Sequence, residues 1–342
     1  MSSNLNQLRY HELAFRTQYA ELKERTFGAG PLLPGSPGTL AVRSGTGFSY
    51  WYRIFYPVPR KQSETLVCKD GDIAALDAMR SRIEFSGWLA DQVSALRKLG
   101  FQVADKATAR VLVELHNQGA FEGGLVLVGT LAFMAWLNEF GVRAVTSRTQ
   151  DVDLARRHPL KLATPLSFMH TMRATELPFV AVPGLPSTKP STSVKLPGVD
   201  GLRVDLLVHG KALGRVVRVP ELRWAAQAMP FYDYLLAEPE SAAMLAGAQC
   251  IPLRLPQAAR FVWHKFYSSI KRRGFPEKAR KDRSQALTLG AALASDDSRA
   301  LLKAGRAVPD EMLKAISSQT QSLLEQAASY PELAEVLRTV LR

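Results

Sequence analysis

Apolar residues along the chain change their spacing several times, and each change predicts a different kind of element. Between residues 73 and 96 they recur mostly at three- and four-residue steps, the period of a helix with one buried face, and Gly100 ends that pattern. The same spacing predicts helices over the first 25 residues and over residues 105–117 and 131–140. The compact apolar run Leu125–Val128 is typical of a buried strand.

Other runs, rich in aromatic or β-branched residues, predict further strands. Residues 49–55 form one such run, and residues 64–68 offer a partner across the turn at 57–62, which predicts a β-hairpin. Two more strands are predicted around residues 143–155 and at residues 202–208. The Pro-, Ser- and Thr-rich stretch 183–197 between them is either a surface excursion or the edge of a sheet.

Helical spacing returns after residue 255 and continues to the last residue. It predicts helices at residues 257–270, 276–294, 309–326 and 331–341. We therefore predict three regions: an N-terminal helical region with a β-hairpin (1–104), a mixed α/β core (105–254) and a C-terminal helical domain (255–342). A chain of 342 residues is long enough for two or three packed units.

Composition narrows the class of partner. Lys and Arg outnumber Asp and Glu by 44 to 31, a formal net charge of +13, which favours nucleic acid, a nucleotide or an acidic protein. No apolar stretch approaches the roughly 20 residues of a membrane span, and the first residues lack the apolar core of a secretory signal. The two cysteines, Cys68 and Cys250, are too few for a disulfide framework. We expect a cytoplasmic protein that does not enter a membrane.

Two aspartates, Asp151 and Asp153, stand two residues apart within a predicted strand. Residues i and i+2 of a strand project to the same face, so the two carboxylates point together while Val152 and Leu154 face the core. Asp205 has similar apolar neighbours in the next predicted strand, and it joins the pair if the two strands are adjacent. Three convergent carboxylates repel one another unless a divalent cation lies among them, and Mg²⁺ prefers such oxygen ligands.

A glycine turn precedes the pair of aspartates. Gly129 and Thr130 follow the buried strand at the predicted start of a helix, where free backbone N–H groups and the helix dipole suit a phosphate group. Read alone, the turn is equally well explained as an ordinary helix start, and a D-x-D pair alone is common on solvated surfaces. Together they indicate phosphoryl or nucleotidyl transfer, in which metal ions stabilise the attacking and leaving oxygens.

These residues resemble the pattern of a known family. Leu127–Phe133, Gly141-Val142, Thr149–Leu154 and Val204–Leu206 resemble the bacterial nucleotidyltransferase-fold family in which a VGT-LAF turn precedes T-x-D-x-D. That family is similar in turn to the AbiE-type and MenT-type toxins of the DNA polymerase β-like nucleotidyltransferase superfamily. The resemblance implies an α/β (α+β) polymerase β-like core, in which a small mixed sheet is flanked by helices.

The resemblance also implies roles for the residues of the motifs. Asp151, Asp153 and Asp205 become catalytic carboxylates that bind Mg²⁺, and Gly129 and Thr130 become contacts to a nucleoside triphosphate (NTP), the donor. Every carboxylate of the pattern is present, so nothing in the sequence marks this protein as an inactive copy.

Relatives carry a lysine in the helical region after the sheet, with an arginine and an acidic residue further along. Lys265 matches the lysine, and Arg272, Lys281 and Asp282 follow it. Residues 265–283 hold eight Lys or Arg against two acidic residues, a density that suits a triphosphate or an RNA backbone. A solvated helical face is the alternative interpretation. We interpret Lys265, Arg272 and Lys281 as donor-phosphate contacts.

The leading hypothesis is therefore a Mg²⁺-dependent nucleotidyltransferase that moves a nucleotidyl group from an NTP to a hydroxyl acceptor. The net charge favours RNA, such as tRNA, as that acceptor, and the relatives suggest a toxin-like role with a cognate antitoxin or another protein partner. The alternative is a non-catalytic nucleotidyltransferase-fold module that binds nucleic acid or protein. The aromatic and basic hairpin, with Tyr56 and Arg60, either stacks on acceptor bases or packs as a half-buried sheet.

Overall fold

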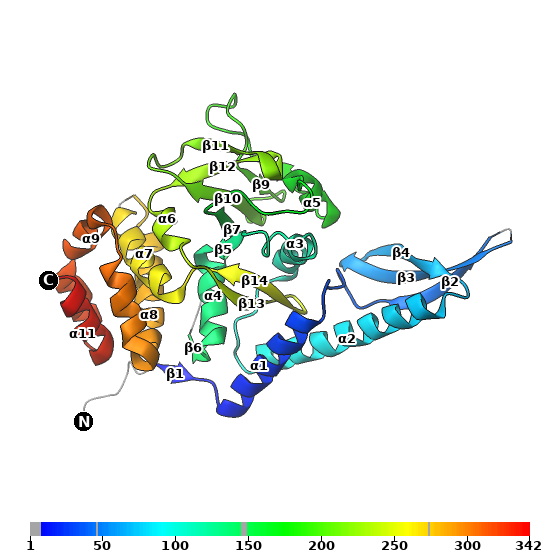
Figure 1. The fold of residues 1–342 in the computed structure, drawn as a ribbon, viewed down its shortest axis with the longest axis horizontal. Coiled ribbons are helices and arrows are strands. Elements are labelled where there is room, and N and C mark those ends of the chain that lie inside the picture. Colours follow the sequence, from blue (N-terminus) through cyan, green and yellow to red (C-terminus); the bar gives the residue numbers. More distant parts are fainter. Residues whose placement is uncertain (1–7, 46, 145–148, 273) are drawn as a thin grey trace.

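The fold is that of a computed structural model, which describes residues 8–45, 47–144, 149–272 and 274–342. An α+β body carries helices on one side, and an arm made of N-terminal elements projects from the other side (Figure 1). This architecture confirms the predicted α+β fold class. No helix in the described ranges has the length and apolarity to cross a membrane.

The arm consists of two helices and a three-stranded antiparallel sheet. These elements are α1 (Leu13–Gly28), α2 (Ile73–Lys98), β2 (Thr39–Ser44), β3 (Ser49–Val58) and β4 (Lys61–Lys69). The predicted hairpin is confirmed as β3 and β4, whereas β2 was missed because none of its residues is fully buried and no apolar alternation marks it. Asp72 caps α2 by accepting a hydrogen bond from the Ala75 N–H at 3.1 Å.

The body is built on a mixed sheet with the order β11-β12-β10-β7-β5. Its strands are β5 (Val126–Val128), β7 (Asp151–Arg156), β10 (Arg203–His209), β11 (Val216–Val219) and β12 (Trp224–Met229). The strand pairs β7–β10 and β10–β12 are parallel, and β5 is antiparallel to β7. β9 (Ser193–Lys195) lies beside the first residues of β10 and pairs with β8 (Val180–Ala181). The Pro-rich stretch before β10 therefore includes an ordered sheet edge.

Shorter elements surround this sheet. They are α3 (Lys106–Asn117), α4 (Gly129–Glu139), α5 (Phe168–Ala174), a 3₁₀ turn (Pro220–Leu222), α6 (Tyr232–Leu235) and the hairpin of β13 (Glu240–Ala246) and β14 (Gln249–Leu255). The strand region predicted around residues 143–155 is confirmed, and it contains two separate strands among the described residues. Its first part is β6 (Val142–Arg143), which pairs with β1 (Arg9–Tyr10) away from the main sheet, and only β7 belongs to the main sheet.

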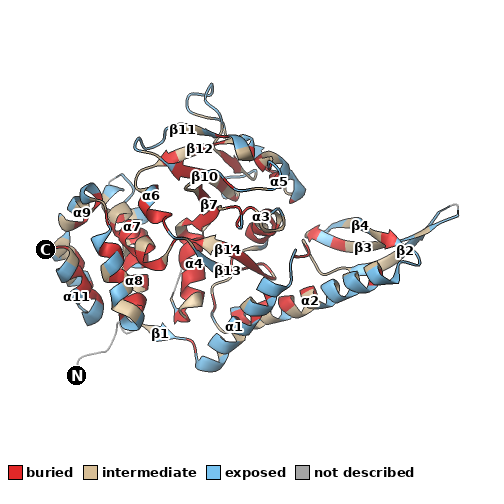
Figure 2. Cartoon of the chain, in the orientation of Figure 1, coloured by how far each residue is buried: buried red, intermediate tan, exposed pale blue. Residues whose placement is uncertain are grey.

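Five helices complete the chain: α7 (Ala258–Lys271), α8 (Pro276–Arg306), α9 (Asp310–Ser317), α10 (Thr320–Gln326) and α11 (Pro331–Val340). α8 continues beyond its predicted end at 294, across a kink at Asp297, and the helix predicted at 309–326 is divided near Gln319. Buried side chains are concentrated in the sheet, α4 and α7 (Figure 2). One hydrophobic cluster joins the sheet to the C-terminal helices, and the boundaries at 104/105 and 254/255 stay a prediction.

Candidate functional site

The parallel pair β7–β10 places the three predicted carboxylates on one face of the sheet. The register sets Asp205 opposite Asp153, and Arg203 opposite Asp151. The alternating residues Val152 and Val204 are fully buried on the other face. Paired residues of adjacent strands lie about 5 Å apart, so Asp153 and Asp205 are immediate neighbours.

The glycine turn lies directly against this carboxylate face. β5 pairs Val128 with Asp153, and Gly129 then begins α4 with φ of 72°. A Cβ atom on Gly129 would lie 2.1 Å from the Oδ2 atom of Asp153, so only glycine leaves room for this carboxylate at the start of the helix. Thr130 follows as a buried residue in the first turn of α4.

Asp153 is held in an unfavourable electrostatic setting. Burial, followed by the neighbouring carboxylates of Asp205 and Asp151, raises the pKa of Asp153 to about 7. Lys265 and Arg272 act in the opposite direction on this pKa. The carboxylates of Asp151 and Asp153 have no hydrogen-bond or ion-pair partner among the described residues. A cation bound at this face would relieve the repulsion.

Asp205 is held differently, by two polar neighbours. The Ser193 hydroxyl donates a hydrogen bond to its Oδ1 atom, and the Arg203 Nε–H donates to the same atom at 2.8 Å. Arg203 also donates from Nη2 to the Ser193 Oγ atom at 2.8 Å. These roles were missed by the sequence analysis, because Ser193 reaches the site through the pairing of β9 with β10.

Of the predicted phosphate contacts, Lys265 lies on α7, Lys281 lies on α8, and Arg272 directly follows the end of α7. Lys265 is buried, and its Nζ atom lies 2.6 Å from Oδ1 of the buried Asp282. The Nε atom of Arg272 lies 3.1 Å from the other oxygen of the same carboxylate. The pKa of Lys281 is lowered by burial and then by Lys265, while the Asp151 carboxylate opposes that shift. Asp282 therefore pairs with Lys265 and Arg272. The third predicted cation, Lys281, interacts electrostatically with Asp151 on the carboxylate face.

One aromatic residue beside the carboxylates was missed by the sequence analysis. Tyr232 begins α6 and is buried, and its pKa is raised mainly by burial and next by the Asp153 carboxylate. Its ring meets that of His264 edge-on at 5.4 Å, and burial lowers the pKa of His264 to about 4. His264 is therefore neutral at pH 7, and the two rings form an uncharged wall beside the carboxylates.

Within the described ranges, no three Asp, Glu, His or Cys side chains are arranged to hold a metal ion. At Asp205, hydrogen bonds from Ser193 and Arg203 engage one carboxylate oxygen within the protein. The residues nevertheless fit Mg²⁺, which binds through one or two carboxylates together with water and substrate phosphates. Asp151 and Asp153 supply such a pair.

The mixed sheet, the glycine turn and the acidic face together define the class of a nucleotidyltransferase fold. A family model described as Nucleotidyltransferase matches residues 106–308, more than half of the chain. The chain belongs to this family. The match begins at α3, ends just after α8 and includes every predicted site residue, whereas the arm lies outside it. No curated protein and no solved structure matches the chain.

Proposed function

We propose that this family member is an active, Mg²⁺-dependent enzyme that transfers a nucleotidyl group from an NTP to a hydroxyl group of RNA. The register that sets Asp205 beside Asp153, with Asp151 on the same face, carries this proposal. A carboxylate whose pKa is raised to about 7 and which has no partner among the described residues is poised for a cation rather than for a structural role.

The donor triphosphate fits between the glycine turn and the basic residues of α7 and α8. The N–H groups at the start of α4, near Gly129 and Thr130, offer hydrogen bonds to phosphate oxygens. Lys265, Arg272 and Lys281 supply positive charge from the other side. Asp282 positions Lys265 and Arg272, because its two oxygens lie next to one group of each.

The reaction exchanges one P–O bond at the α-phosphorus for another. The acceptor hydroxyl oxygen forms a bond to the α-phosphorus, the bond from that phosphorus to the bridging oxygen breaks, and pyrophosphate leaves. Asp205 accepts the hydroxyl proton at its Oδ2 atom, because Ser193 and Arg203 already engage its Oδ1 atom. Asp151, Asp153 and Asp205 would hold Mg²⁺, which would supply charge stabilisation for the phosphates and for the attacking and leaving oxygens.

The acceptor class is inferred from charge. A net charge of +13 favours a polyanion, and RNA offers both phosphates and free hydroxyl groups. We extend the proposal to a tRNA acceptor and to a toxin-like role in the cytoplasm, with an antitoxin or other protein partner, on the resemblance to AbiE-type and MenT-type toxins.

The test is transfer of label from each α-³²P-labelled NTP to total RNA in the presence of Mg²⁺. The double variant Asp151→Ala/Asp153→Ala should transfer label at least about 10³-fold more slowly than the wild type, because it lacks groups that stabilise charge in the transition state. Control variants with matched exposed aspartates, Asp77→Ala and Asp91→Ala, should keep the wild-type rate. Label transfer that survives the double substitution would refute the mechanism. Absence of transfer by the wild type with every NTP would favour a non-catalytic binding module.

Gly129→Ala tests the close approach of the turn to Asp153. Alanine at this φ costs about 1–2 kcal/mol of unfolding free energy, and the new Cβ atom displaces the Asp153 carboxylate. A displacement of about 1 Å at a reacting group lowers the transfer rate on the order of 10²-fold. Gly119→Ala is the matched control, since Gly119 has φ of 68° and open space around its position. Urea unfolding should show similar losses for both variants, and equal transfer rates would contradict the proposed contact.

A further inference from the structure

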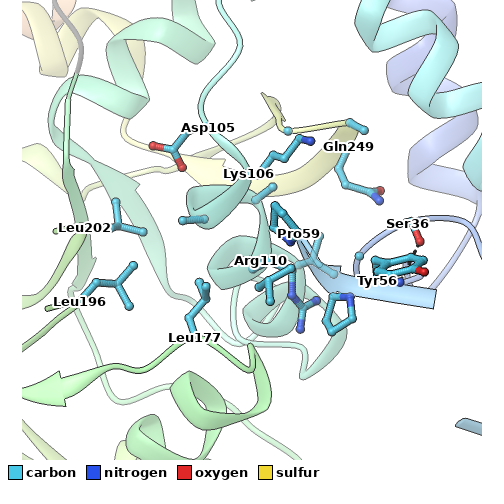
Figure 3. A pocket seen from close by; sticks show the side chains of 18 of the residues that line it. Ser36, Tyr56, Pro59, Asp105, Lys106, Arg110, Leu177, Leu196, Leu202 and Gln249 are labelled. Carbon is cyan, nitrogen blue, oxygen red and sulfur yellow. Dashed lines mark hydrogen bonds between the residues drawn. The ribbon is translucent and has the colours of Figure 1, made fainter. Parts of the chain in front are cut away.

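A cavity among the described residues lies between the arm and the body, away from the carboxylates. It measures about 690 Å³, within the range of small-molecule sites. Tyr56 and Pro59 come from the arm, whereas Leu177, Leu196 and Leu202 come from the body (Figure 3). Sites formed where two units meet are common binding sites, and this one combines flat apolar surfaces from both.

The cavity lies at the end of the strands that carry the carboxylates, on the opposite face of the sheet. Gln150 and Leu202 line the cavity, and the next residues along the chain, Asp151 and Arg203, project to the other face. The Cα atoms of Gln150 and Asp151 are about 3.8 Å apart, as in any trans peptide. An extended polymer that passes the strand ends therefore reaches the cavity and the carboxylates together.

Three buried polar residues of the wall have unused hydrogen-bonding capacity. Arg110 donates to Thr175, Ala174 and Glu114, but its Nη1 atom has no hydrogen-bond partner among the described residues. The same holds for the Oε1 atom of Gln249 and the hydroxyl of Ser86. The Arg110 Nη1 atom is a donor that needs an acceptor, and the Gln249 Oε1 atom is an acceptor that needs a donor. The Ser86 hydroxyl can pair with either. These atoms are inaccessible to solvent as the side chains stand, and rotation of the side chains toward the cavity would offer them to the edge of a planar heterocycle.

Lys106 gives the cavity an exposed cation for a phosphate group, and the exposed carboxylate of Asp200 also lines it. Lys106 is exposed at the start of α3 and lines the cavity together with Arg110. Arg53 is close enough to Arg110 for the two cations to repel, since its pKa is lowered to about 10 by burial and then by Arg82 and Arg110. The lining residue Asp105 is already used, because its side chain caps α3 by accepting the Thr108 N–H at 2.7 Å.

We propose that this cavity binds an unstacked base of a single-stranded nucleic acid, with the Tyr56 ring as the stacking surface. Single-stranded RNA is recognised by bases that stack on aromatic side chains and present their edges to polar groups. The cavity would then form part of the acceptor site of the proposed transferase. The inference rests on the proposed function only where it identifies the bound strand as the acceptor.

The test is binding to a fluorescent single-stranded oligoribonucleotide that contains 4-thiouridine, without NTP or Mg²⁺. Tyr56→Ala should weaken binding about tenfold, the loss of one stacked base. Tyr50→Ala is the matched control, because Tyr50 is an exposed tyrosine near the other end of the same strand, and it should bind like the wild type. Irradiation of the wild-type complex should crosslink the base to the peptide that contains Tyr56. Ala107→Trp, which fills the cavity from α3, gives a second route to the same loss.

The possible results separate this inference from the proposed function. Equal losses for Tyr50→Ala and Tyr56→Ala, or crosslinks only outside the cavity, would overturn the base site even if label transfer occurs. Tyr56-dependent binding without label transfer would keep the base site and refute the transferase. Adenosine and uridine 5′-monophosphates are tested as free competitors: displacement of the oligonucleotide at equal affinity identifies a free nucleotide as the source of the base, and oligonucleotide binding that resists them identifies a polymer.

Discussion

Asp282→Ala should lose about 3–5 kcal/mol of unfolding free energy, because it leaves the Lys265 ammonium buried without its carboxylate partner. Both side chains are almost completely inaccessible, at 8% for Lys265 and 3% for Asp282, and they lie 2.6 Å apart. Urea unfolding at pH 7 measures the loss. Glu335→Ala is the control, since it removes an exposed ion pair with Arg338 and should cost no more than about 1 kcal/mol.

A double substitution separates the structural role of this pair from its role in binding the donor. Lys265→Met/Asp282→Leu replaces the buried pair by apolar side chains of similar volume, and such replacements are often neutral in stability. Arg272 is 42% exposed and is free to turn toward solvent once Asp282 is gone. The double variant should therefore fold with close to wild-type stability.

The same double variant should still lose on the order of 10²-fold in the transfer rate, if Lys265 acts on the triphosphate as proposed. Raising the NTP concentration tells whether the loss lies in KM or in kcat. A stable double variant with the wild-type rate would make Lys265 and Asp282 a purely structural pair. A double variant as unstable as Asp282→Ala would show that the apolar replacement does not fit the space between α7 and α8.

The carboxylate face could be predicted from the sequence because the alternation of polar and apolar residues points to it in two separate strands. The alternation of Asp151 and Asp153 with buried Val152 and Leu154 fixed the face of β7, and the same alternation around Asp205 fixed that of β10. Periodicity left the adjacency of these two strands open, and the resemblance implied it by making Asp205 the third ligand. The register that sets Asp205 opposite Asp153 is a long-range pairing, which periodicity alone does not specify.

Residues whose roles depend on contacts between distant segments could not be found in this way. Ser193 reaches Asp205 across two strands, and Asp282 reaches Lys265 across a helix pair. The cavity draws on the arm, α3, the turn between β13 and β14 and the segments around Leu177 and Leu202, which share no sequence pattern. The exposed strand β2 was missed for a related reason, because it shows no buried alternation and its backbone pairs with β3.

Asp153→Asn should stabilise the ligand-free protein at pH 8 much more than at pH 5. The pKa of Asp153 is about 7 in the folded protein, mainly because of burial, against an ordinary value near 4 in the unfolded chain. Between these two values the folded state holds a proton that the unfolded chain has released, so stability falls as the pH rises through this window. Asparagine does not ionise, so the unfolding free energy of the variant does not fall for this reason as the pH rises.

The difference in unfolding free energy between Asp153→Asn and the wild type should therefore grow by about 2–3 kcal/mol from pH 5 to pH 8. Urea titrations without divalent cations measure it, with the exposed Asp91→Asn as the control that should show no such growth. Mg²⁺ at pH 8 should then stabilise the wild type by mass action, because a cation held by ionised Asp153 binds the folded state. Asp153→Asn should gain less from Mg²⁺, since it lacks that charge. An equal gain in both proteins would place the metal away from Asp153, whatever the transfer assay shows.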